Sequence, residues 1–544
     1  MNNKMNHISS LWVQSHKISN EYKKYILEMS EDDINRFFTD DKMTFGTAGI
    51  RATMGPGTNQ INTFTYQQMA EGFARWLLLT KENPSVVVAH DNRKNADFYS
   101  KVVAKVLTSF GIKVIFFPNN ELKATPITSY AIRMAKADGG IIITASHNPK
   151  NYLGFKVYNS FGAQILPDDA NKIVALMPEN NTILDNEYAI NNDLIEYFDN
   201  SITESYFKDA TKCLIHTDVD KEKIFPIIFT AHHGTASHDL PNFLNTLGYK
   251  NVIKVEQQCV PDSNFTYSPI SNPEDKRSFE LSLKYAEKNK SDIMLAVDPD
   301  SDRLAVAVLH DNKWRYLTGN EMGIIFTHYV LKNKTFTKEP FIISTYVSTY
   351  YIDKIAKEFD AKVFRTATGF KWVGNVLEQY YQQQDFVVGF EEAIGSLNSD
   401  IGRDKDGFQA AALALEVYDE CRMHDKTLID YLNDIFNEYG AWAGETVSYL
   451  IEAPNWKETM SARMDYFAKM KNKNILNLKI LENKYNKKAD ALEWILEDGM
   501  WIKFRMSGTE PKFKVYFNLY GETVEEANRL LDALKLEIDI ILRS

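Results

Sequence analysis

The sequence predicts an α/β protein of several domains, and three observations support this. Helical periodicity alternates with short apolar stretches over residues 63–133, and the alternation returns after residues 224 and 319. The 544 residues are too many for a single hydrophobic core. From about residue 440 the pattern changes to strands and a closing helix. We expect three mixed-sheet α/β domains, 1–210, 211–318 and 319–440, followed by a smaller α+β domain, 441–544.

The first expected domain opens with amphipathic helices, and Ser30 with the acidic residues after it resembles a capping box. Apolar spacing predicts further helices at 67–79, 98–110 and 126–134. Runs of β-branched and aromatic residues predict strands at 85–89, 113–117, 141–143 and 154–158.

The later domains carry the same signals. Strands are expected at 224–230, 292–297 and 304–309, and then at 341–345, 363–364 and 386–388. In the last domain, strands are expected at 447–452 and 500–504, and an amphipathic helix at 524–542.

Composition narrows the class of protein. A net charge of −11 argues against a general binder of nucleic acid or anionic membranes. The three cysteines are far apart, which fits a reducing compartment and excludes a cysteine-built metal site. Residues 1–7 show no apolar core region and no small-residue cleavage site, and no uncharged apolar run of about 18 residues or more occurs. We therefore expect a soluble, cytoplasmic protein.

Ser146 follows the apolar strand at 141–143, in the run T-A-S-H-N-P at 144–149. Pro149 cannot continue a strand, so the serine hydroxyl stands on a tight loop at a strand end, where α/β sheets bind ligands. It is a candidate nucleophile. The alternative is a turn in which Ser146 and His147 bond their own backbone. A serine hydrolase is disfavoured because no G-x-S-x-G surrounds Ser146.

Three aspartates, Asp298, Asp300 and Asp302, alternate in the run D-P-D-S-D-R after the strand at 292–297. In an extended loop their carboxylates lie on one side, and hard oxygen donors suit Mg²⁺. An EF-hand is excluded because Arg303 and Leu309 occupy its glycine and glutamate positions. A phosphatase with Asp298 as nucleophile and a solvated acidic turn remain as alternatives.

Three further loops carry candidate ligands. The run R-M-S-G-T at 505–509, with Lys512, offers donors that match a phosphate monoester, or is a β-turn with flanking charges. Glu391, in G-F-E-E-A-I-G at 389–395, either accepts bonds from sugar hydroxyls or is merely exposed. Arg51 follows a glycine-rich turn, and its guanidinium can grip an oxyanion.

The four runs at 144–149, 298–303, 389–395 and 505–509, with T-G-F-K-W at 368–372, occur in an order and at intervals that resemble the α-D-phosphohexomutase family. Within it, the chain resembles the longer phosphoglucomutase/phosphomannomutase type that includes phosphopentomutases. The resemblance extends from Gly46 to Lys512. It implies four domains around a central cleft, with one loop from each domain meeting there.

The resemblance also implies roles for particular residues. Ser146 would carry a phosphoryl group, and Mg²⁺ would lie between Ser146 and the three aspartates. Sugar or phosphate binding would fall to a set of residues from the other loops: Arg303, Thr368, Gly369, Glu391, Ala393, Arg505, Ser507, Gly508, Thr509 and Lys512. Lys405, His147 and Arg51 are candidates for proton handling or charge stabilisation, with Lys405 first.

The reaction implied is interconversion of hexose 1-phosphate and hexose 6-phosphate, of glucose or mannose, through a sugar bisphosphate that also acts as activator. Ala393 stands where many phosphoglucomutases carry a serine, which leaves mannose and pentose phosphates open. Phosphopentomutase or glucose-1,6-bisphosphate synthase-like activity is the nearer alternative. The phosphatase and a silent sugar-phosphate binder are more distant ones. The expected partners are small-molecule sugar phosphates, with no nucleic acid or membrane, for a monomer or homodimer.

Overall fold

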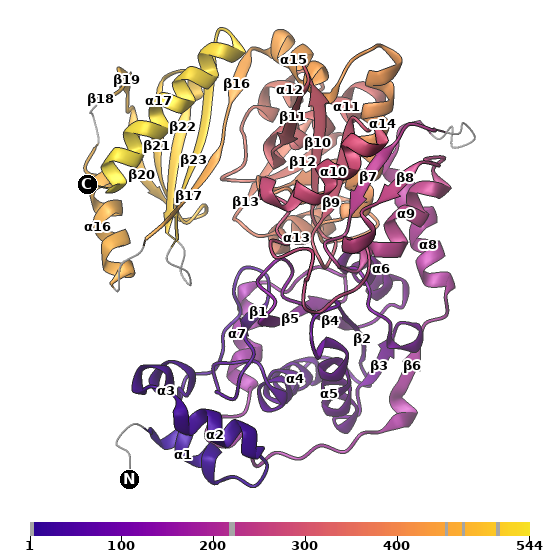
Figure 1. Ribbon diagram of the computed structural model, residues 1–544, viewed down its shortest axis with the longest axis vertical. Coiled ribbons are helices and arrows are strands. Elements are labelled where there is room, and N and C mark those ends of the chain that lie inside the picture. Colours follow the sequence, from indigo (N-terminus) through magenta and orange to yellow (C-terminus); the bar gives the residue numbers. More distant parts are fainter. Residues whose placement is uncertain (1–4, 217–222, 452–454, 471–473, 507–511, 544) are drawn as a thin grey trace. The chain divides into compact units, whose positions relative to one another are not determined.

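The computed structural model describes residues 5–216, 223–451, 455–470, 474–506 and 512–543. The chain forms two compact units, which Figure 1 shows as ribbons. Unit 1 comprises Met1–Leu304 and Ser399–Ala412, and unit 2 comprises Ala305–Asn398 and Leu413–Ser544. Among the described helices, none is both long and apolar enough to cross a membrane.

Unit 1 contains a mixed sheet that carries the Ser146 loop. Its strands, in spatial order, are β1 (Ile50–Thr53), β5 (Tyr152–Asn159), β4 (Gly139–Ile143), β2 (Ser85–His90), β3 (Lys113–Phe116) and β6 (Ile195–Tyr197). β4, β2, β3 and β6 are parallel, whereas β5 is antiparallel to both β4 and β1. The loop at 144–149 is therefore the connection by which the chain reverses from β4 into β5.

Helices cover both faces of this sheet. They are α4 (Thr63–Leu78), α5 (Ala96–Ser109), α6 (Thr125–Met134), α7 (Pro167–Leu176) and α8 (Ser201–Ala210). The alternation of strand side chains assigns the faces: Val86 and Val88 join the core cluster that holds α4 and α5 residues. On the other face a Cβ at Gly140 would lie 2.3 Å from Ile132 of α6. Glycine there lets α6 pack directly on β4.

Three short helices precede this sheet: α1 (His7–Gln14), α2 (Asn20–Glu28) and α3 (Glu31–Phe37). Their apolar faces share a small core around Trp12, which is 1% exposed. The Ser30 side chain accepts a hydrogen bond from the Asp33 amide at 3.1 Å, so the expected helix start at Ser30 is confirmed.

The remainder of unit 1 contains the parallel strands β8 (Val252–Lys254), β7 (Ile227–Thr230) and β9 (Ile293–Val297), with α9 (Ala236–Thr246) and α10 (Glu280–Asn289). All five residues of β9 are buried, as expected for a strand covered on both faces. The aspartate loop follows β9 directly. The chain then passes into unit 2 at the start of the hairpin of β10 (Leu304–His310) and β11 (Lys313–Leu317).

Unit 2 contains a second helix-flanked mixed sheet with the strand order β13 (Lys362–Thr366), β12 (Pro340–Thr345), β14 (Asp385–Phe390) and β15 (Ser396–Leu397). β15 is antiparallel to β14, and β12, β13 and β14 are parallel. The helices are α11 (Gly319–Asn333), α12 (Ile352–Glu358), α13 (Phe370–Tyr380), α15 (Leu428–Tyr439) and the part of α14 (Gly407–Met423) that follows Ala412.

The C-terminal part of unit 2 is an antiparallel sheet. In order, its strands are β16 (Ala441–Ala443), β23 (Lys512–Gly521), β22 (Trp501–Met506), β21 (Ala491–Ile495) and β20 (Glu482–Asn486), and β17 (Thr446–Leu450) also pairs with β23. α16 (Trp456–Ala468), the pair β18 (Asn474–Ile475) and β19 (Leu478–Lys479), and α17 (Val524–Arg543) complete it. Figure 1 shows α17 lying across the sheet.

The spacing of apolar residues explains how α17 packs. Ala527, Leu531, Leu534 and Ile538 recur every three or four residues and are buried in the core under the sheet. The expected α/β class and the expected strands and helices are confirmed within a few residues at each end. β20 was not anticipated, because its polar sequence has no apolar alternation. The domain boundaries at 210, 318 and 440 stay predictions.

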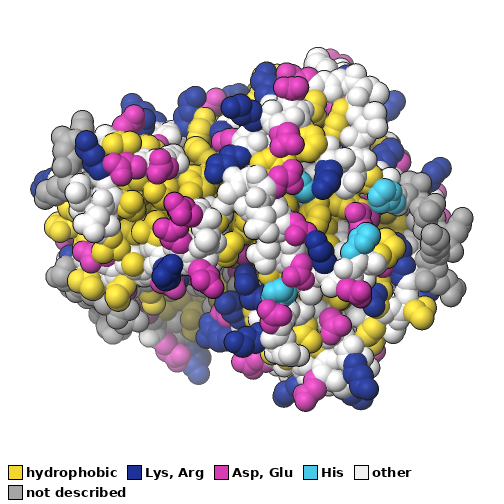
Figure 2. Space-filling view, turned by 90° about the horizontal axis from the view of Figure 1, so that it is seen from above, with side chains coloured by type: hydrophobic (Ala, Val, Ile, Leu, Met, Phe, Trp, Pro, Cys, Tyr) yellow, Lys and Arg dark blue, Asp and Glu magenta, His cyan; other side chains and the backbone are white. Residues whose placement is uncertain are grey.

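The surface carries charges of both signs. On the face in Figure 2, lysine and arginine side chains are interspersed with aspartate and glutamate. Such mixing is typical of a well-solvated protein surface.

Candidate active site

Ser146 is buried in unit 1, at 1% exposure, in the loop between β4 and β5. Its backbone is left-handed, with φ +50°, which is unusual for a residue with a side chain. The Ser146 amide donates to Thr144 Oγ1 at 2.8 Å. The Ser146 hydroxyl donates to Asp298 Oδ2 at 2.6 Å and lies 3.2 Å from His147 Nδ1. The loop therefore aims the hydroxyl at the aspartate loop.

Arg93 holds this loop in shape. Its guanidinium donates to the carbonyl oxygens of Ser146 at 2.6 Å, Pro149 at 2.9 Å and Tyr152 at 3.0 Å. Asp91 lies 3.4 Å from Arg93 Nε and compensates its charge, and both side chains are fully buried. Burial lowers the pKa of Arg93, which Asp91 partly restores. The sequence indicated only a polar loop here, and the positioning role of Arg93 was missed.

Arg51 extends from β1 to the same loop. Its Nη1 donates to Asn148 Oδ1 at 2.8 Å, while its Nε is buried with no hydrogen-bond partner among the described residues. Burial lowers the pKa of Arg51, and the aspartates of the next loop raise it again. A buried guanidinium N–H without a partner is a donor available to an anionic ligand.

Asp298, Asp300 and Asp302 follow β9 and are 0%, 0% and 1% exposed. One carboxylate oxygen from each lies within 4.8 Å of the others. Burial and the two neighbouring carboxylates raise the pKa of Asp298 well above its ordinary value. Like charges this close repel, and so the cluster needs cations.

Two lysines supply part of that charge. Lys156 Nζ, in the middle of β5, lies 2.6 Å from Asp300 Oδ2 and 3.1 Å from Asp302 Oδ2. Lys405 Nζ lies 3.1 Å from Asp302 Oδ2 and 3.2 Å from Asp404 Oδ1. Burial raises the pKa of Asp300, but Lys156, a hydrogen bond from Asp298 and the charge of Arg51 together lower it below its ordinary value. Lys156 was missed, although a lysine inside an otherwise apolar strand was a usable signal.

The cluster fits a divalent cation. The Oδ1 atoms of Asp300 and Asp302 are buried and have no hydrogen-bond partner among the described residues. Three hard carboxylate ligands with two unsatisfied buried oxygens are the donor set that Mg²⁺ prefers. Asp298, Asp300 and Asp302 are thus suited to hold it beside Ser146.

His147 and Arg303 flank the cluster. Burial, followed by the positive charges of Arg303 and Arg51, holds the pKa of His147 well below its ordinary value, so its imidazole is neutral. Arg303 contributes its backbone amide to Asp298 Oδ1 at 3.0 Å and its Nη1 to Glu274 at 3.2 Å. The structure thus brings together Ser146, His147, Arg51, Arg303, Lys405 and the three aspartates in unit 1.

Unit 2 brings together two other expected segments. The Gly369 amide, at the start of α13, donates to Glu391 Oε1 at 2.9 Å. Gly369 has φ +111°, which favours glycine, and Glu391 is 7% exposed on the turn after β14. Thr368 Oγ1 is buried without a partner among the described residues, and Ala393 is partly buried on the same turn. This cluster contains the Glu391 carboxylate and the Thr368 hydroxyl, which has no hydrogen-bond partner among the described residues.

The phosphate loop expected after Arg505 is described only at its two ends. Arg505 is on β22 and Lys512 begins β23, while Ser507, Gly508 and Thr509 lie outside the described residues. Arg505 is directly opposite Lys514 across the two strands, so Arg505, Lys512 and Lys514 share one face of the sheet. These three side chains form a cationic face on the two strands. Nothing in the sequence indicated that Lys514 belongs to it.

Comparison with protein families identifies three matches along the chain. The sequence models of the phosphoglucomutase/phosphomannomutase α/β/α domains I, II and III match residues 42–183, 204–311 and 318–439.

Curated relatives match nearly the whole chain. It is 46% identical over 542 residues to a phosphomannomutase of Mycoplasmoides pirum, covering 98% of this chain and 100% of the relative. It is 30% identical to a phosphoglucomutase of Staphylococcus aureus strain MRSA252, covering 96% and 98%. Among solved structures, the phosphoglucomutase pp63/parafusin from Paramecium aligns with a TM-score of 0.70 at 18% identity, covering 93% and 96%, which supports the fold.

Proposed function

The chain belongs to the phosphoglucomutase/phosphomannomutase family, and on that premise we propose that it interconverts the 1-phosphate and 6-phosphate of a hexose, glucose or mannose. In this proposal Ser146 carries the phosphoryl group between the two positions. A sugar bisphosphate is the intermediate, and it also activates enzyme whose serine is not phosphorylated.

One observation carries the proposal: the Ser146 hydroxyl lies 2.6 Å from a carboxylate of a buried aspartate cluster that has two unsatisfied oxygens. Phosphoryl transfer requires a positioned nucleophile and neutralisation of the charge on the transferred group. A hydroxyl that merely closed a turn would bond the backbone near it, whereas this one reaches Asp298, 152 positions further on.

In the first half-reaction the bond between phosphorus and Ser146 Oγ breaks, and a bond forms from phosphorus to the free hydroxyl oxygen of the bound hexose phosphate. The sugar hydroxyl proton passes to a base, and Ser146 Oγ takes up a proton as it leaves. In the second half, the bond between phosphorus and the sugar oxygen at the other position breaks and phosphorus bonds to Ser146 Oγ; the serine proton passes to a base and the sugar oxygen takes up a proton. When bound at Asp298, Asp300 and Asp302, Mg²⁺ supplies Lewis-acid stabilisation of phosphoryl oxygens. Arg93 keeps Oγ in place by holding the loop carbonyls.

Three side chains are candidates for proton handling or charge stabilisation. Lys405 lies between Asp302 and Asp404, at 3.1 and 3.2 Å, and this position suits it to charge stabilisation. His147 is neutral and has Nδ1 3.2 Å from Ser146 Oγ, so it is placed to share the serine proton. Arg51 contributes its unpartnered Nε–H to the phosphoryl oxygens. We keep all three as candidates.

Sugar recognition is assigned to unit 2. Glu391, held by the Gly369 amide, accepts bonds from sugar hydroxyls, and Thr368 adds a hydroxyl. Arg505, Lys512 and the loop between them hold the phosphate that is not being transferred. The intermediate must turn over between half-reactions, so this loop receives either phosphate.

The preferred sugar follows in part from Ala393. A methyl group there offers the sugar no hydrogen bond, which favours acceptance of both glucose and mannose phosphates over strict preference for one. We further propose that the enzyme is cytoplasmic and acts as a monomer or homodimer on small-molecule sugar phosphates.

Labelling tests the phosphoserine. Incubation with phosphorus-labelled glucose 1,6-bisphosphate should label the wild type and the Ser109→Ala control, whose serine is exposed on α5, but not Ser146→Ala. The label should resist hydroxylamine, since a serine phosphate ester is stable to it. A hydroxylamine-labile label would instead support Asp298 as the nucleophile of a phosphatase.

A coupled assay tests the substrate. Glucose 1-phosphate, mannose 1-phosphate and ribose 1-phosphate are compared with and without the bisphosphate. Turnover of both hexose phosphates, stimulated by bisphosphate, is expected. Turnover of ribose 1-phosphate alone would make the enzyme a phosphopentomutase and contradict the hexose assignment.

A further inference from the structure

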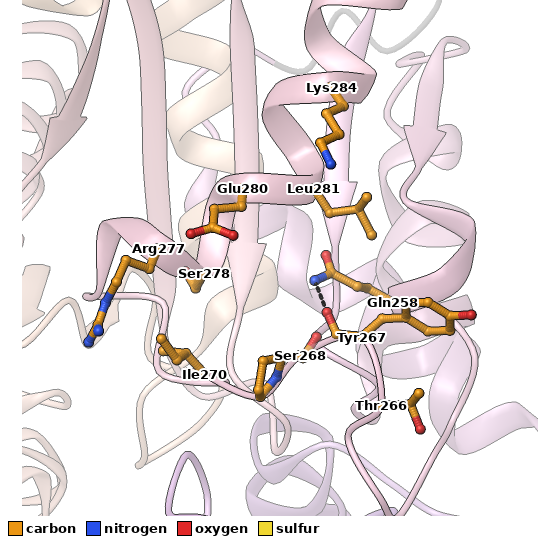
Figure 3. Close-up of a pocket in the computed structure, with 11 residues that line it drawn as sticks. Gln258, Thr266, Tyr267, Ser268, Ile270, Arg277, Ser278, Glu280, Leu281 and Lys284 are labelled. Carbon is orange, nitrogen blue, oxygen red and sulfur yellow. Dashed lines mark hydrogen bonds between the residues drawn. The ribbon is translucent and has the colours of Figure 1, made fainter.

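Unit 1 contains a cavity whose lining includes no residue of the Ser146 loop or of the aspartate loop. It has a volume of about 260 Å³ and is enclosed by α10, the turn before it, and the segment at 266–270. Figure 3 shows its lining. A water molecule takes about 30 Å³, and drug-sized sites begin near 300 Å³. The cavity therefore suits a small metabolite.

Two buried hydroxyls in its wall have no hydrogen-bond partner in the part of the chain that the structure describes. Ser268 Oγ and Ser278 Oγ make no hydrogen bond among the described residues, and the two residues are 2% and 4% exposed. Leaving a buried hydroxyl unsatisfied costs about 1–3 kcal/mol, so two of them lining one cavity indicate a polar occupant.

Charges on α10 define the character of that occupant. Lys284 lines the cavity and forms no ion pair among the described residues, whereas Arg277 is already paired with Asp275 at 2.5 Å. Figure 3 shows Lys284 extending from the helix toward Leu281 and Gln258. The cavity also borders the N-terminal end of α10, which continues from the 3-10 turn Lys276–Phe279 capped by Asp275, and the helix dipole at this end favours an anion.

Glu280 excludes a bare anion as the best ligand. Its carboxylate lines the same cavity one helical turn before Lys284, and it would repel an oxyanion but accept bonds from hydroxyl groups. The two serine hydroxyls can donate to the anion or accept from such hydroxyls. A molecule with an anionic group at one end and hydroxyls at the other satisfies all four side chains.

We propose that this cavity is a second binding site, for a small hydroxylated anion such as a polyol phosphate or hydroxy acid. Its occupancy acts on the Ser146 and Asp298 loops. The segment that forms its wall reaches both: the Ser271 hydroxyl donates to the His147 carbonyl at 3.4 Å, and Glu274 pairs with Arg303 at 3.2 Å.

A histidine provides a more direct connection. His232 Nε2 lies 3.3 Å from the Ser278 carbonyl at the cavity, and its Nδ1 lies 2.9 Å from the Val297 carbonyl, one residue before Asp298. His232 is 0% exposed, so its ring is fixed between them. A ligand that orders the Ser278 turn therefore acts, through one side chain, on the end of β9.

Hydrogen exchange of the full-length protein with Mg²⁺ tests the site. The probes are glycerol 3-phosphate and glycerate, with glycerol as the uncharged control. A probe at ten times its dissociation constant should slow exchange of peptides covering 276–284 about tenfold. The effect should vanish in Lys284→Met and persist in Lys288→Met, whose exposed lysine lies on the same helix outside the lining. Ser278→Ala should weaken binding about tenfold.

The two probes identify the anionic group: protection by glycerol 3-phosphate alone assigns a phosphate, and by glycerate alone a carboxylate. Protection at 276–284 by neither probe, or equal protection in Lys284→Met, overturns the site. The coupling is tested by turnover, where the active probe should change the rate in the wild type but not in Lys284→Met. A rate change that survives in Lys284→Met contradicts the coupling. Because exchange is read without turnover, the result does not depend on the mutase assignment.

Discussion

Replacing Lys156 by methionine tests how the aspartate cluster is held. Lys156 Nζ lies 2.6 Å from Asp300 Oδ2 and 3.1 Å from Asp302 Oδ2, and the three side chains are at most 2% exposed. Methionine nearly preserves the volume of the side chain and removes only the charge. The variant leaves Asp300 without a cationic side chain within 4.0 Å among the described residues, while Asp302 keeps Lys405.

Removing one partner of a buried ion pair costs about 3–5 kcal/mol, because the remaining charge is uncompensated. Lys405 still compensates Asp302, so a loss near 3 kcal/mol is expected from unit 1. Mg²⁺ can replace the missing positive charge. Saturating Mg²⁺ should therefore stabilise Lys156→Met more than it stabilises the wild type. The difference in opening free energy between the two proteins should become smaller.

Native-state hydrogen exchange is the suitable measurement, because the chain has two units and need not unfold in one step. Peptides covering β5 and β9 report the opening free energy around the cluster, with EDTA or with Mg²⁺. Lys172→Met is the control. Lys172 is 60% exposed on α7 and pairs only with Asp169 among the described residues, so its loss should cost at most about 1 kcal/mol.

Two outcomes would refute the reasoning. If Lys156→Met in EDTA opens with the same free energy as Lys172→Met, the lysine does not compensate the cluster. If the loss is found but Mg²⁺ stabilises both proteins equally, the cation does not bind where Lys156 acts.

Three further predictions concern other parts of the chain. Arg93→Lys should lower kcat at least about 100-fold, because a single ammonium cannot hold the several carbonyls of the Ser146 loop; steady-state kinetics measure this. Burial lowers the pKa of His328 to about 4, so the unfolded chain takes up a proton before the folded chain does as the pH falls. The stability of unit 2 should therefore drop by up to about 3 kcal/mol between pH 6.5 and pH 4. Hydrogen exchange should show a smaller drop in His328→Gln. Phe467→Ala should destabilise the C-terminal sheet by about 3–5 kcal/mol in urea unfolding, since the ring is 0% exposed and stacks on Phe504 at 4.3 Å.

Each of these has a matched control. Arg133→Lys changes an arginine on α6 that donates to the Phe161 carbonyl at 3.0 Å, away from the Ser146 loop, and it should keep most activity. His7→Gln, in α1 of unit 1, should leave the pH profile of unit 2 unchanged. Tyr466→Ala removes a ring next to Phe467. Because Tyr466 is 50% exposed, its loss should lower the free energy of unfolding much less. A variant indistinguishable from its control would contradict the corresponding role.

Much of the site was predictable because its signals are local. Ser146 and the three aspartates follow apolar strands, and strand ends carry the ligands of α/β sheets. A continuous apolar run predicted β9 and the period of three to four residues predicted α17, because each signal depends on neighbours a few positions away. The polar edge strand β20 was missed because its pairing with β21 has no local pattern.

Local sequence patterns reveal which residue types stand at which strand ends. The packing of distant segments settles that Ser146 faces Asp298, that Lys156 lies between two aspartates, and that Arg93 holds the loop. These contacts join segments up to 152 positions apart, and their distances depend on strand order and packing of whole elements. No periodicity within one segment carries that information, because the energy that sets it comes from burial shared between segments.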